Sequence, residues 1–358
     1  MPIRVPVLFL LTVMLSLGTA AADPDTYSLL TLGREAAKLG DLEKAERYHR
    51  SAVGLAEQSG NTVELAEAIG DLGGVLLARG RLREAKELSL KSLNLLRDSK
   101  GARYMPVVLN NLGVIAMNTG NYVQSEAFFK EALRGVRDFP RPDPYEARVL
   151  NNLGALYCTI QDLDKAEKAF KKAISVIEKQ LGPDRAELAP FLSNLGGVYA
   201  LRKKWSSAEP LLQRALSLMQ QSPQPDKLNL AGVLDNLGIL EHYRKNLAES
   251  EKLLREAYEL RVALLGRENP LAVVTAIKLA GTLRDSGRFS DSERRYSEAL
   301  AILEKTERLQ TADAATAFEE LARLLRKTNR EQKAEPLEAK AKAIRFDLEH
   351  TVSAANLP

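Results

Sequence analysis

The side chains that most often carry out catalysis are few in this chain and far apart. Its 358 residues include three histidines, His49, His242 and His350, and a single cysteine, Cys158. Catalysis needs several titratable groups that converge on one point, and the chain has no nucleophile elbow, phosphate-binding loop or zinc-binding helix motif. We therefore predict no enzymatic activity, no metal site and no cofactor, with an enzyme whose site is unrecognised as the alternative from another class.

A ladder of side-chain amides could do chemistry of another kind, the recognition of a second chain. Asparagine recurs every 41 or 42 residues, at Asn111, Asn152, Asn194 and Asn236. The residue before each is polar too: Asn110, Asn151, Ser193 and Asp235. An amide offers both donors and an acceptor, so it can bond the main chain of an extended segment or fix the register of neighbouring repeats. The sequence leaves both roles open.

The amides belong to a repeat that runs along the whole chain. A Leu-Gly or Leu-Ala pair returns every 40 to 42 residues, and its second member is Gly33, Gly73, Gly113, Gly154, Gly196, Gly238, Ala280 and Ala322. Such a period indicates one supersecondary unit copied eight times. We number the units one to eight and call the second member of each pair position 0, so that the four asparagines lie at position −2.

Each unit has the pattern of two helices joined by a turn. The fifth unit shows the i, i+3, i+4, i+7 spacing of an apolar helical face at Leu192, Leu195, Gly196 and Tyr199. A second apolar stripe covers 208–219, and the polar break 202–204 separates the two. In other units the break carries a glycine: Gly40, Gly80, Gly120 and Gly287. The pattern predicts a helix–turn–helix in every unit.

Small residues recur at fixed positions of each unit and indicate close helix packing. Glycine inside a helix costs about 1 kcal/mol relative to alanine, so its repeated use at position 0 needs a steric reason. Positions +12 and +19 carry only alanine or serine, and small residues on facing helices let the two axes approach. Glutamate follows position +12 in every unit except the second, which has Lys86. These glutamates are expected to face solvent and to pair with Lys or Arg a turn away.

The pattern of each unit resembles the tetratricopeptide repeat. It consists of Leu-Gly, a small residue twelve positions later, an aromatic residue or leucine near +16 and alanine at +19. The 42-residue period and the segments 151–154, 181–184, 208–212 and 265–270 are similar to the kinesin-light-chain type and its bacterial relatives. The resemblance covers residues 25 to 348. It implies an all-α, right-handed α-solenoid of about eight stacked helix–turn–helix repeats, in which first helices line the concave face and each unit packs only on its neighbours.

The same resemblance implies a domain plan and a function. We expect the solenoid over 25–336, a C-terminal capping helix over 337–350 and a disordered tail over 351–358. The predicted function is that of a non-catalytic scaffold that binds a peptide or partner protein in the concave groove. The alternative is a purely structural, self-associating envelope spacer, whose amides only fix the stacking of the repeats.

The predicted peptide-binding residues follow from the position of the ladder. In kinesin-light-chain-like repeats, asparagines at the matching position line the groove and can contact bound peptide, which implies Asn111, Asn152, Asn194 and Asn236. Neighbouring groove positions add Asn110, Asn151, Arg148, Gly197 and His242. Arginines in the late units favour an acidic or polar partner segment: Arg284, Arg323 and Arg326.

The first 22 residues have the pattern of a secretory signal peptide. Arg4 precedes an apolar run over 5–17, and small residues lead to a cleavage site near Ala22. The prediction is a periplasmic or secreted protein, with an uncleaved membrane anchor as the alternative. Without Arg4 the chain has 50 basic and 47 acidic residues, interspersed along it, so neither a nucleic acid nor, after cleavage, a membrane is an expected partner. The single cysteine excludes an internal disulfide.

Overall fold

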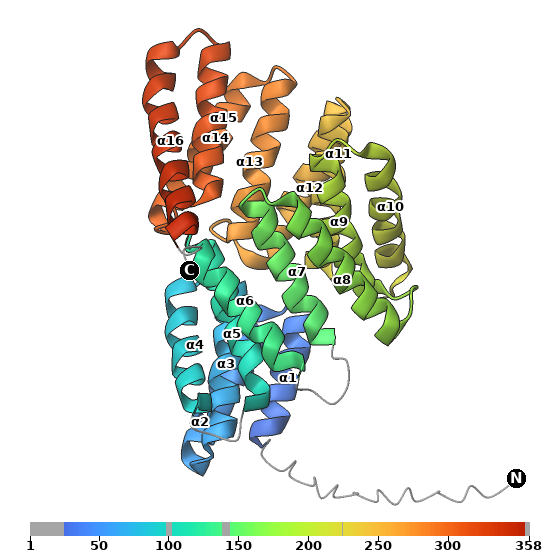
Figure 1. Ribbon diagram of the computed structural model, residues 1–358, viewed down its shortest axis with the longest axis vertical. Helices are drawn as coiled ribbons and strands as arrows, with labels where there is room; N and C mark the ends of the chain where they lie inside the picture. The colour runs from blue at the N-terminus through green and yellow to red at the C-terminus, as the bar shows by residue number, and fades with distance from the viewer. Residues whose placement is uncertain (1–24, 98–101, 138–143, 224, 355–358) are drawn as a thin grey trace, which may run out of the picture.

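The chain folds into paired helices throughout the part that the computed structural model describes, residues 25–97, 102–137, 144–223 and 225–354. This part contains sixteen α-helices, two short 3-10 helices at Ala102–Tyr104 and Ala186–Leu188, and no strand. The predicted all-α solenoid of eight helix–turn–helix units is therefore confirmed (Figure 1). The predicted signal peptide lies outside the described residues. None of the helices described is both long and apolar enough to cross a membrane.

Each unit contributes one first helix and one second helix. The first helices are α1 (Thr26–Lys38), α3 (Thr62–Ala78), α5 (Met105–Asn118), α7 (Pro144–Thr159), α9 (Ala189–Leu201), α11 (Lys227–Tyr243), α13 (Pro270–Asp285) and α15 (Ala312–Lys327). The second helices are α2 (Leu42–Ser59), α4 (Leu82–Arg97), α6 (Tyr122–Arg137), α8 (Leu163–Leu181), α10 (Trp205–Gln221), α12 (Leu247–Leu265), α14 (Phe289–Lys305) and α16 (Glu331–Ala354).

Position 0 is small because it receives the side chain at +16 of the same unit. A Cβ at Gly154 would lie 2.7 Å from Cε1 of Phe170, and one at Gly196 would lie 2.7 Å from Cγ of Leu212. Both distances are too short for carbon atoms in contact. The steric role predicted for position 0 is confirmed, with +16 as its partner. Position +12 lies on the same seam between the two helices, where Ser125 donates a hydrogen bond of 2.7 Å to the carbonyl of Gly113.

The first helices form the inner side of a curved array. Consecutive first helices pack on each other, and each second helix packs on the first helix of the next unit. Consecutive second helices make no comparable contact. In an arc, the members that touch lie on the inside, so the first helices line the concave face. We call this surface the inner face.

The array also closes on itself, which the sequence did not predict. The side-chain amide of Asn269 donates to the carbonyl of Ala78 over 2.7 Å, and Arg308 Nε donates to the carbonyl of Asn118 over 3.1 Å. Helix α16 packs on α6 in the same region (Figure 1). The expectation that each unit packs only on its neighbours is therefore wrong. Units six to eight also contact units one to three, along an interface that we call the closure interface.

The last helix is longer than the repeat pattern predicts. Helix α16 runs without a break from Glu331 to Ala354, so it serves both as the second helix of unit eight and as the end of the array. The predicted division between 336 and 337 falls inside it, and so do the first four residues of the predicted tail. Pro336 lies inside the helix, beyond its first turn, and has no backbone N–H to donate to the preceding turn.

Candidate functional site

The four asparagines at position −2 connect neighbouring first helices. Asn152 Nδ2 donates to Oδ1 of Asn110 over 2.9 Å, and Asn194 Nδ2 donates to Oδ1 of Asn151 over 2.8 Å. Asn236 Nδ2 donates to the carbonyl and hydroxyl oxygens of Ser193 over 3.1 and 3.0 Å, and Asn111 Nδ2 reaches the carbonyl of Gly70 at 3.4 Å. These acceptors lie at position −3 of the preceding unit, and Asn236 Nδ2 also lies 3.5 Å from Oδ1 of Asn194, at position −2. The ladder therefore fixes the register of the stack.

These bonds use the donors of the amides and leave acceptors. At Asn111 and Asn236 the partner is a main-chain carbonyl, which can only accept, so Nδ2 must face it and Oδ1 must point elsewhere. Both side chains are half-buried, as are those of Asn152 and Asn194. The register role therefore does not exclude the binding role, because Oδ1 can still accept a hydrogen bond from another chain.

The other predicted binding residues occupy three kinds of place. Asn110 is 6% exposed and acts as a buried acceptor, and Asn151 is a half-buried one. Gly197 is buried beneath Asn236, whose Oδ1 would lie 3.0 Å from a Cβ there. Arg148 is exposed, and its guanidinium lies 5.5 Å from the ring centre of Tyr145. No ion pair joins Arg148 to any described residue.

His242 sits in a polar network between α11 and α13 rather than alone on the inner face. Its Nδ1 lies 3.0 Å from Oγ1 of Thr282, and its Nε2 lies 3.3 Å from a carboxylate oxygen of Asp285. Burial lowers the pKa of His242, and the Asp285 carboxylate offsets part of that effect. The imidazole has both nitrogens engaged within the protein.

The arginines that suggested an acidic partner are already paired. Arg284 is 6% exposed and contacts both Asp285 and Glu320. Arg323 pairs with Glu320 over 2.6 Å, and Arg326 pairs with Glu338 over 2.6 Å. These three residues have carboxylate partners within the chain, so they give no reason to expect an acidic partner.

A buried group of charges that the sequence did not single out lies deeper in the late units. Asp235, at position −3 of unit six and 3% exposed, pairs with Arg261 over 3.2 Å and with Lys278. Lys278 also interacts electrostatically with Asp313, which lies 3.4 Å from Arg308. Three cations thus share two carboxylates. Arg261 Nε and Arg308 Nη1 are buried without a hydrogen-bond partner among the described residues.

Two opposing forces act on the Asp235 carboxyl. Burial would raise its pKa, but Lys278 and Arg261 outweigh that effect and hold the pKa below its ordinary value. Asp235 therefore stays charged. The only advance signal for this group is an acidic residue at position −3, where units three to five carry Asn or Ser.

Cys158 lies on α7 and is half-buried. Burial raises the pKa of its thiol to about 12, although the Lys278 ammonium of α13 offsets part of the shift. The thiol is therefore protonated at neutral pH, as expected of a packing residue rather than a nucleophile.

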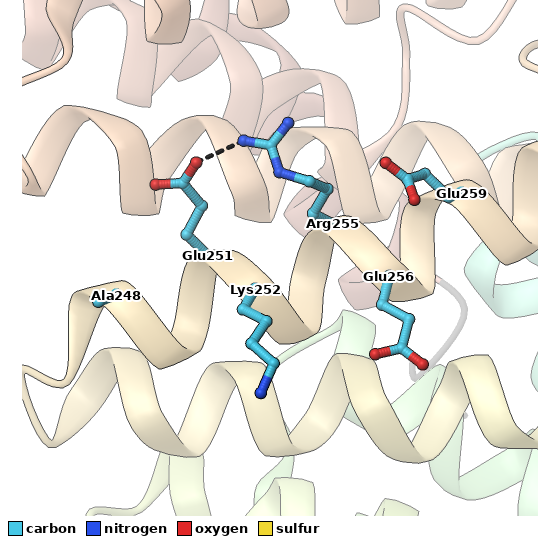
Figure 2. A pocket seen from close by; sticks show the side chains of 6 residues that line it. All are labelled: Ala248, Glu251, Lys252, Arg255, Glu256 and Glu259. Carbon is cyan, nitrogen blue, oxygen red and sulfur yellow. Dashed lines mark hydrogen bonds and ion pairs between the residues drawn. The ribbon is translucent and has the colours of Figure 1, made fainter.

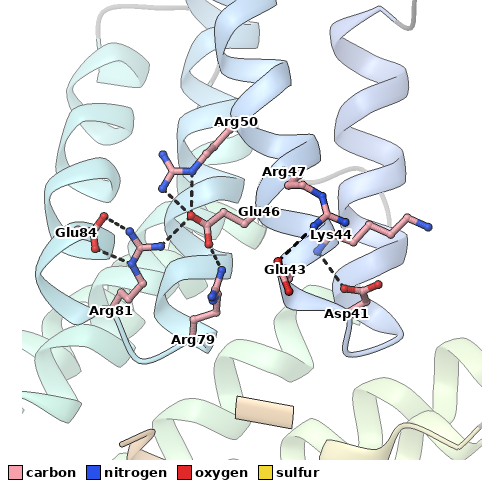
Figure 3. Close-up of polar contacts among 9 residues, drawn as sticks. All are labelled: Asp41, Glu43, Lys44, Glu46, Arg47, Arg50, Arg79, Arg81 and Glu84. Carbon is pink, nitrogen blue, oxygen red and sulfur yellow. Dashed lines mark hydrogen bonds and ion pairs between the residues drawn. The ribbon is translucent and has the colours of Figure 1, made fainter. Parts of the chain in front are cut away.

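The glutamates after position +12 form a second set of contacts between units, on the outer side. Glu167 accepts from Tyr199 over 3.0 Å and from Arg202 over 2.9 Å, both in the next unit. Glu46 is 7% exposed and binds Arg50, Arg79 and Arg81 (Figure 3). The expected pairing within one helix occurs as well, but the contacts across units are what order these side chains.

One open depression on the outer face offers no convergent site. Figure 2 shows an open depression lined by Ala248, Glu251, Lys252, Arg255, Glu256 and Glu259. All six residues belong to α12, and the one group that a neighbouring unit brings to them, the guanidinium of Arg288, is paired with Glu251 over 2.6 Å. Within the described ranges, no three His, Cys, Asp or Glu side chains gather as metal ligands would.

The comparison with known protein families agrees with the repeat architecture. The tetratricopeptide repeat model matches four overlapping segments, 104–179, 145–221, 187–261 and 229–305, which together span more than half of the chain. Among curated protein sequences nothing matches significantly.

Two solved Rap structures share the fold at low sequence identity. A Rap protein complexed with competence and sporulation factor superposes with a TM-score of 0.63 and 13% identity, over 91% of this chain and 99% of that one. The apo form of RapI has a TM-score of 0.57 and 17% identity, over 78% and 99%. A putative kinesin light chain from Podosopora anserina has a TM-score of 0.41 and 17% identity, over 58% and 98%.

Proposed function

Because this chain belongs to the tetratricopeptide repeat family, whose members typically mediate protein–protein interactions, we propose that it binds an extended segment of a partner protein on the inner face of units three to six and catalyses no reaction. The observation that carries the proposal is the amide ladder, whose donors are used between units and whose Oδ1 atoms keep lone pairs as acceptors, although that of Asn194 also lies 3.5 Å from Asn236 Nδ2. A Rap protein of similar fold is complexed with competence and sporulation factor, which supports this use of the architecture.

Recognition by the ladder does not depend on the partner's side chains. Amide oxygens spaced along a rigid face accept main-chain N–H groups, which every residue except proline carries. The surface is ordered before binding, because the inter-unit bonds already hold each asparagine. Such preorganisation reduces the entropy that this chain loses on association. Most of the ordering that accompanies binding therefore takes place in the partner segment.

The late units add a preference for one acidic group on the partner. Arg261, Lys278 and Arg308 outnumber Asp235 and Asp313, and a buried charge without a partner is strongly unfavourable. Of the three cations, the side chain of Lys278 is 31% exposed, so it can meet an incoming carboxylate. The proposed partner segment is therefore polar, with an acidic residue or chain end toward unit seven.

We propose that the protein acts outside the cytoplasm. The support is the pattern of residues 1–22, a basic residue, an apolar run and small residues ending at Ala22. N-terminal sequencing of the natural protein tests this: a mature chain that begins near Asp23 in the envelope or secreted fraction supports it, and an intact Met1 there points to an uncleaved anchor.

The function itself is tested by affinity capture. The chain without residues 1–22 is immobilised and exposed to an envelope extract, and captured proteins are cut into overlapping peptides that are assayed for binding. One linear segment should account for the binding, and replacing both Asn152 and Asn194 with alanine should abolish it. Capture that survives this double substitution would place the partner elsewhere and contradict the proposal.

A further inference from the structure

The closure interface joins loops of the late units to turns of the early ones. Leu264, in the last turn of α12, has its Cδ2 3.7 Å from where a Cβ would stand at Gly40. Asn269 and Pro270 approach Gly80 in the same way, at 3.5 Å from Cα and 3.4 Å from Cδ. At Gly120 an added Cβ would overlap the carbonyl oxygen of Gln310. Each of the first three turns is thus covered.

A glycine at position +7 is the sequence feature that these three turns share. All eight units have a positive φ at this position, yet units four, five, six and eight hold it with Gln161, Lys203, Lys245 and Asn329. The backbone therefore does not require glycine. What distinguishes Gly40, Gly80 and Gly120 is that another part of the chain lies against them, whereas Gly287 of unit seven has nothing within 4 Å.

Two buried side chains fasten the interface by capping helices. Asn269 is 4% exposed and donates to the carbonyl of Ala78, the last residue of α3. Arg308 is 2% exposed and donates to the carbonyl of Asn118, the last residue of α5. The final carbonyls of a helix lack partners within it, and a cation there is favoured by the helix dipole.

Closure brings opposite parts of the inner face together. Lys278 of α13 acts electrostatically on Cys158 of α7, although units five and six lie between the two helices along the array. Helix α7 carries Asn152, the second member of the amide ladder, and the neighbouring Leu153 belongs to an apolar cluster that also includes Ala312 of α15.

We propose that the closure interface is a gate, which shields the amide ladder when it is shut and gives a partner segment access to it when it parts. The nature of the entering segment rests on the proposed function, whereas the opening of the closure interface does not. A partner that binds only the open form shifts the equilibrium by its differential affinity for the two forms. The contacts that part are those of the covered turns and of α16 with α6, while the stacked units stay intact.

The gate is tested with a glycine substitution and its matched control. Gly120→Lys places a side chain against Gln310, whereas Gly287→Lys introduces the same residue at the same φ in an uncovered turn. The probe is the reaction rate of the single thiol, Cys158, with DTNB, together with the radius of gyration from small-angle scattering. Gly120→Lys should react about tenfold faster, as an opening equilibrium shifted by ~1.4 kcal/mol requires, and should expand. Gly287→Lys should match the natural chain.

A surface charge pair gives a second test that does not threaten folding. Arg83 and Glu307 pair over 2.7 Å across the closure interface, and their side chains are 76% and 75% exposed. Arg83→Glu should raise the thiol reaction rate, and adding Glu307→Arg should restore it. Equal rates for Gly120→Lys and Gly287→Lys, or no rescue by the charge swap, would overturn the gate. Failure to capture any partner, with these rates as expected, would refute the proposed function and leave the gate standing.

Discussion

At position −2 the four middle units carry asparagine, whereas units two, seven and eight carry Asp71, Lys278 and Glu320. Both sets bond to the preceding unit: the asparagines through Nδ2, and the charged residues through ion pairs with Arg34, Asp235 and Arg284. Each charge is paired within the stack. A neutral amide has an acceptor left over, so only the middle units combine stacking with acceptors for the main chain of another protein.

The largest difference in stability between the two sets is expected when the buried charge of Asp235 is removed from the late units. Asp235→Asn keeps the shape but leaves Arg261 and Lys278 without their carboxylate, and loss of one partner of a buried pair costs about 3–5 kcal/mol. Asn194→Ala in the middle units removes two neutral hydrogen bonds, a short one to Asn151 and a long one from Asn236, worth about 1 kcal/mol each at most. Urea unfolding followed by circular dichroism compares the two. Equal midpoints would show that charge and amide stack equally well.

A smaller difference in stability is expected between variants of two glutamates on the outer side, Glu46 and Glu209. Glu46 binds three arginines and is nearly buried, and burial, which would raise its pKa, is outweighed by those arginines so that the pKa is lowered. Glu46→Gln should lose about 1.5–3 kcal/mol, the range for hydrogen bonds to charged groups. The control is Glu209→Gln in unit five, whose pair with Arg244 is more exposed and should not measurably affect unfolding.

The pH dependence of stability distinguishes unit one from units three and four. His49 fills position +16 in unit one, where Phe129 and Phe170 stand in the others, and burial lowers its pKa. The unfolded chain, with a histidine pKa of about 6.5, then takes up the proton first as pH falls, so stability is full above that value and declines below it.

His49→Phe should therefore raise stability by about 1 kcal/mol at acidic pH, because the protonation penalty and an unpartnered Nδ1 are both removed. Melting temperatures between about pH 8 and pH 5.5, on either side of the ordinary histidine pKa, provide the measurement. His242 remains in the variant, so some slope should persist. A slope as steep as that of the natural chain would exclude His49 as its source.

Contacts between residues that are close in the sequence could be predicted, whereas contacts between distant residues could not. The Leu-Gly spacing predicts the eight helix pairs because each pair is local, and the polar residues at −3 hinted at partners for the amides. The closure interface joins residues about 190 apart in sequence, such as Asn269 and Ala78, and it depends on small rotations added over many units. Gly120 is visible in the sequence as a glycine in a turn. Glycine is common in turns for reasons of local backbone conformation, so its presence there did not indicate a distant partner.

One measurement separates binding from stacking at the ladder. Asn152→Ala and Asn110→Ala delete the same hydrogen bond from its two ends, but Asn110 is buried and only Asn152 can reach another chain. The affinity of the captured partner segment for the two variants is determined by titration calorimetry, after their equal loss of stability has been verified. Asn152→Ala should bind about tenfold more weakly, as loss of ~1.4 kcal/mol requires, while Asn110→Ala should bind as the natural chain does. Equal affinities would show that the ladder only stacks the repeats.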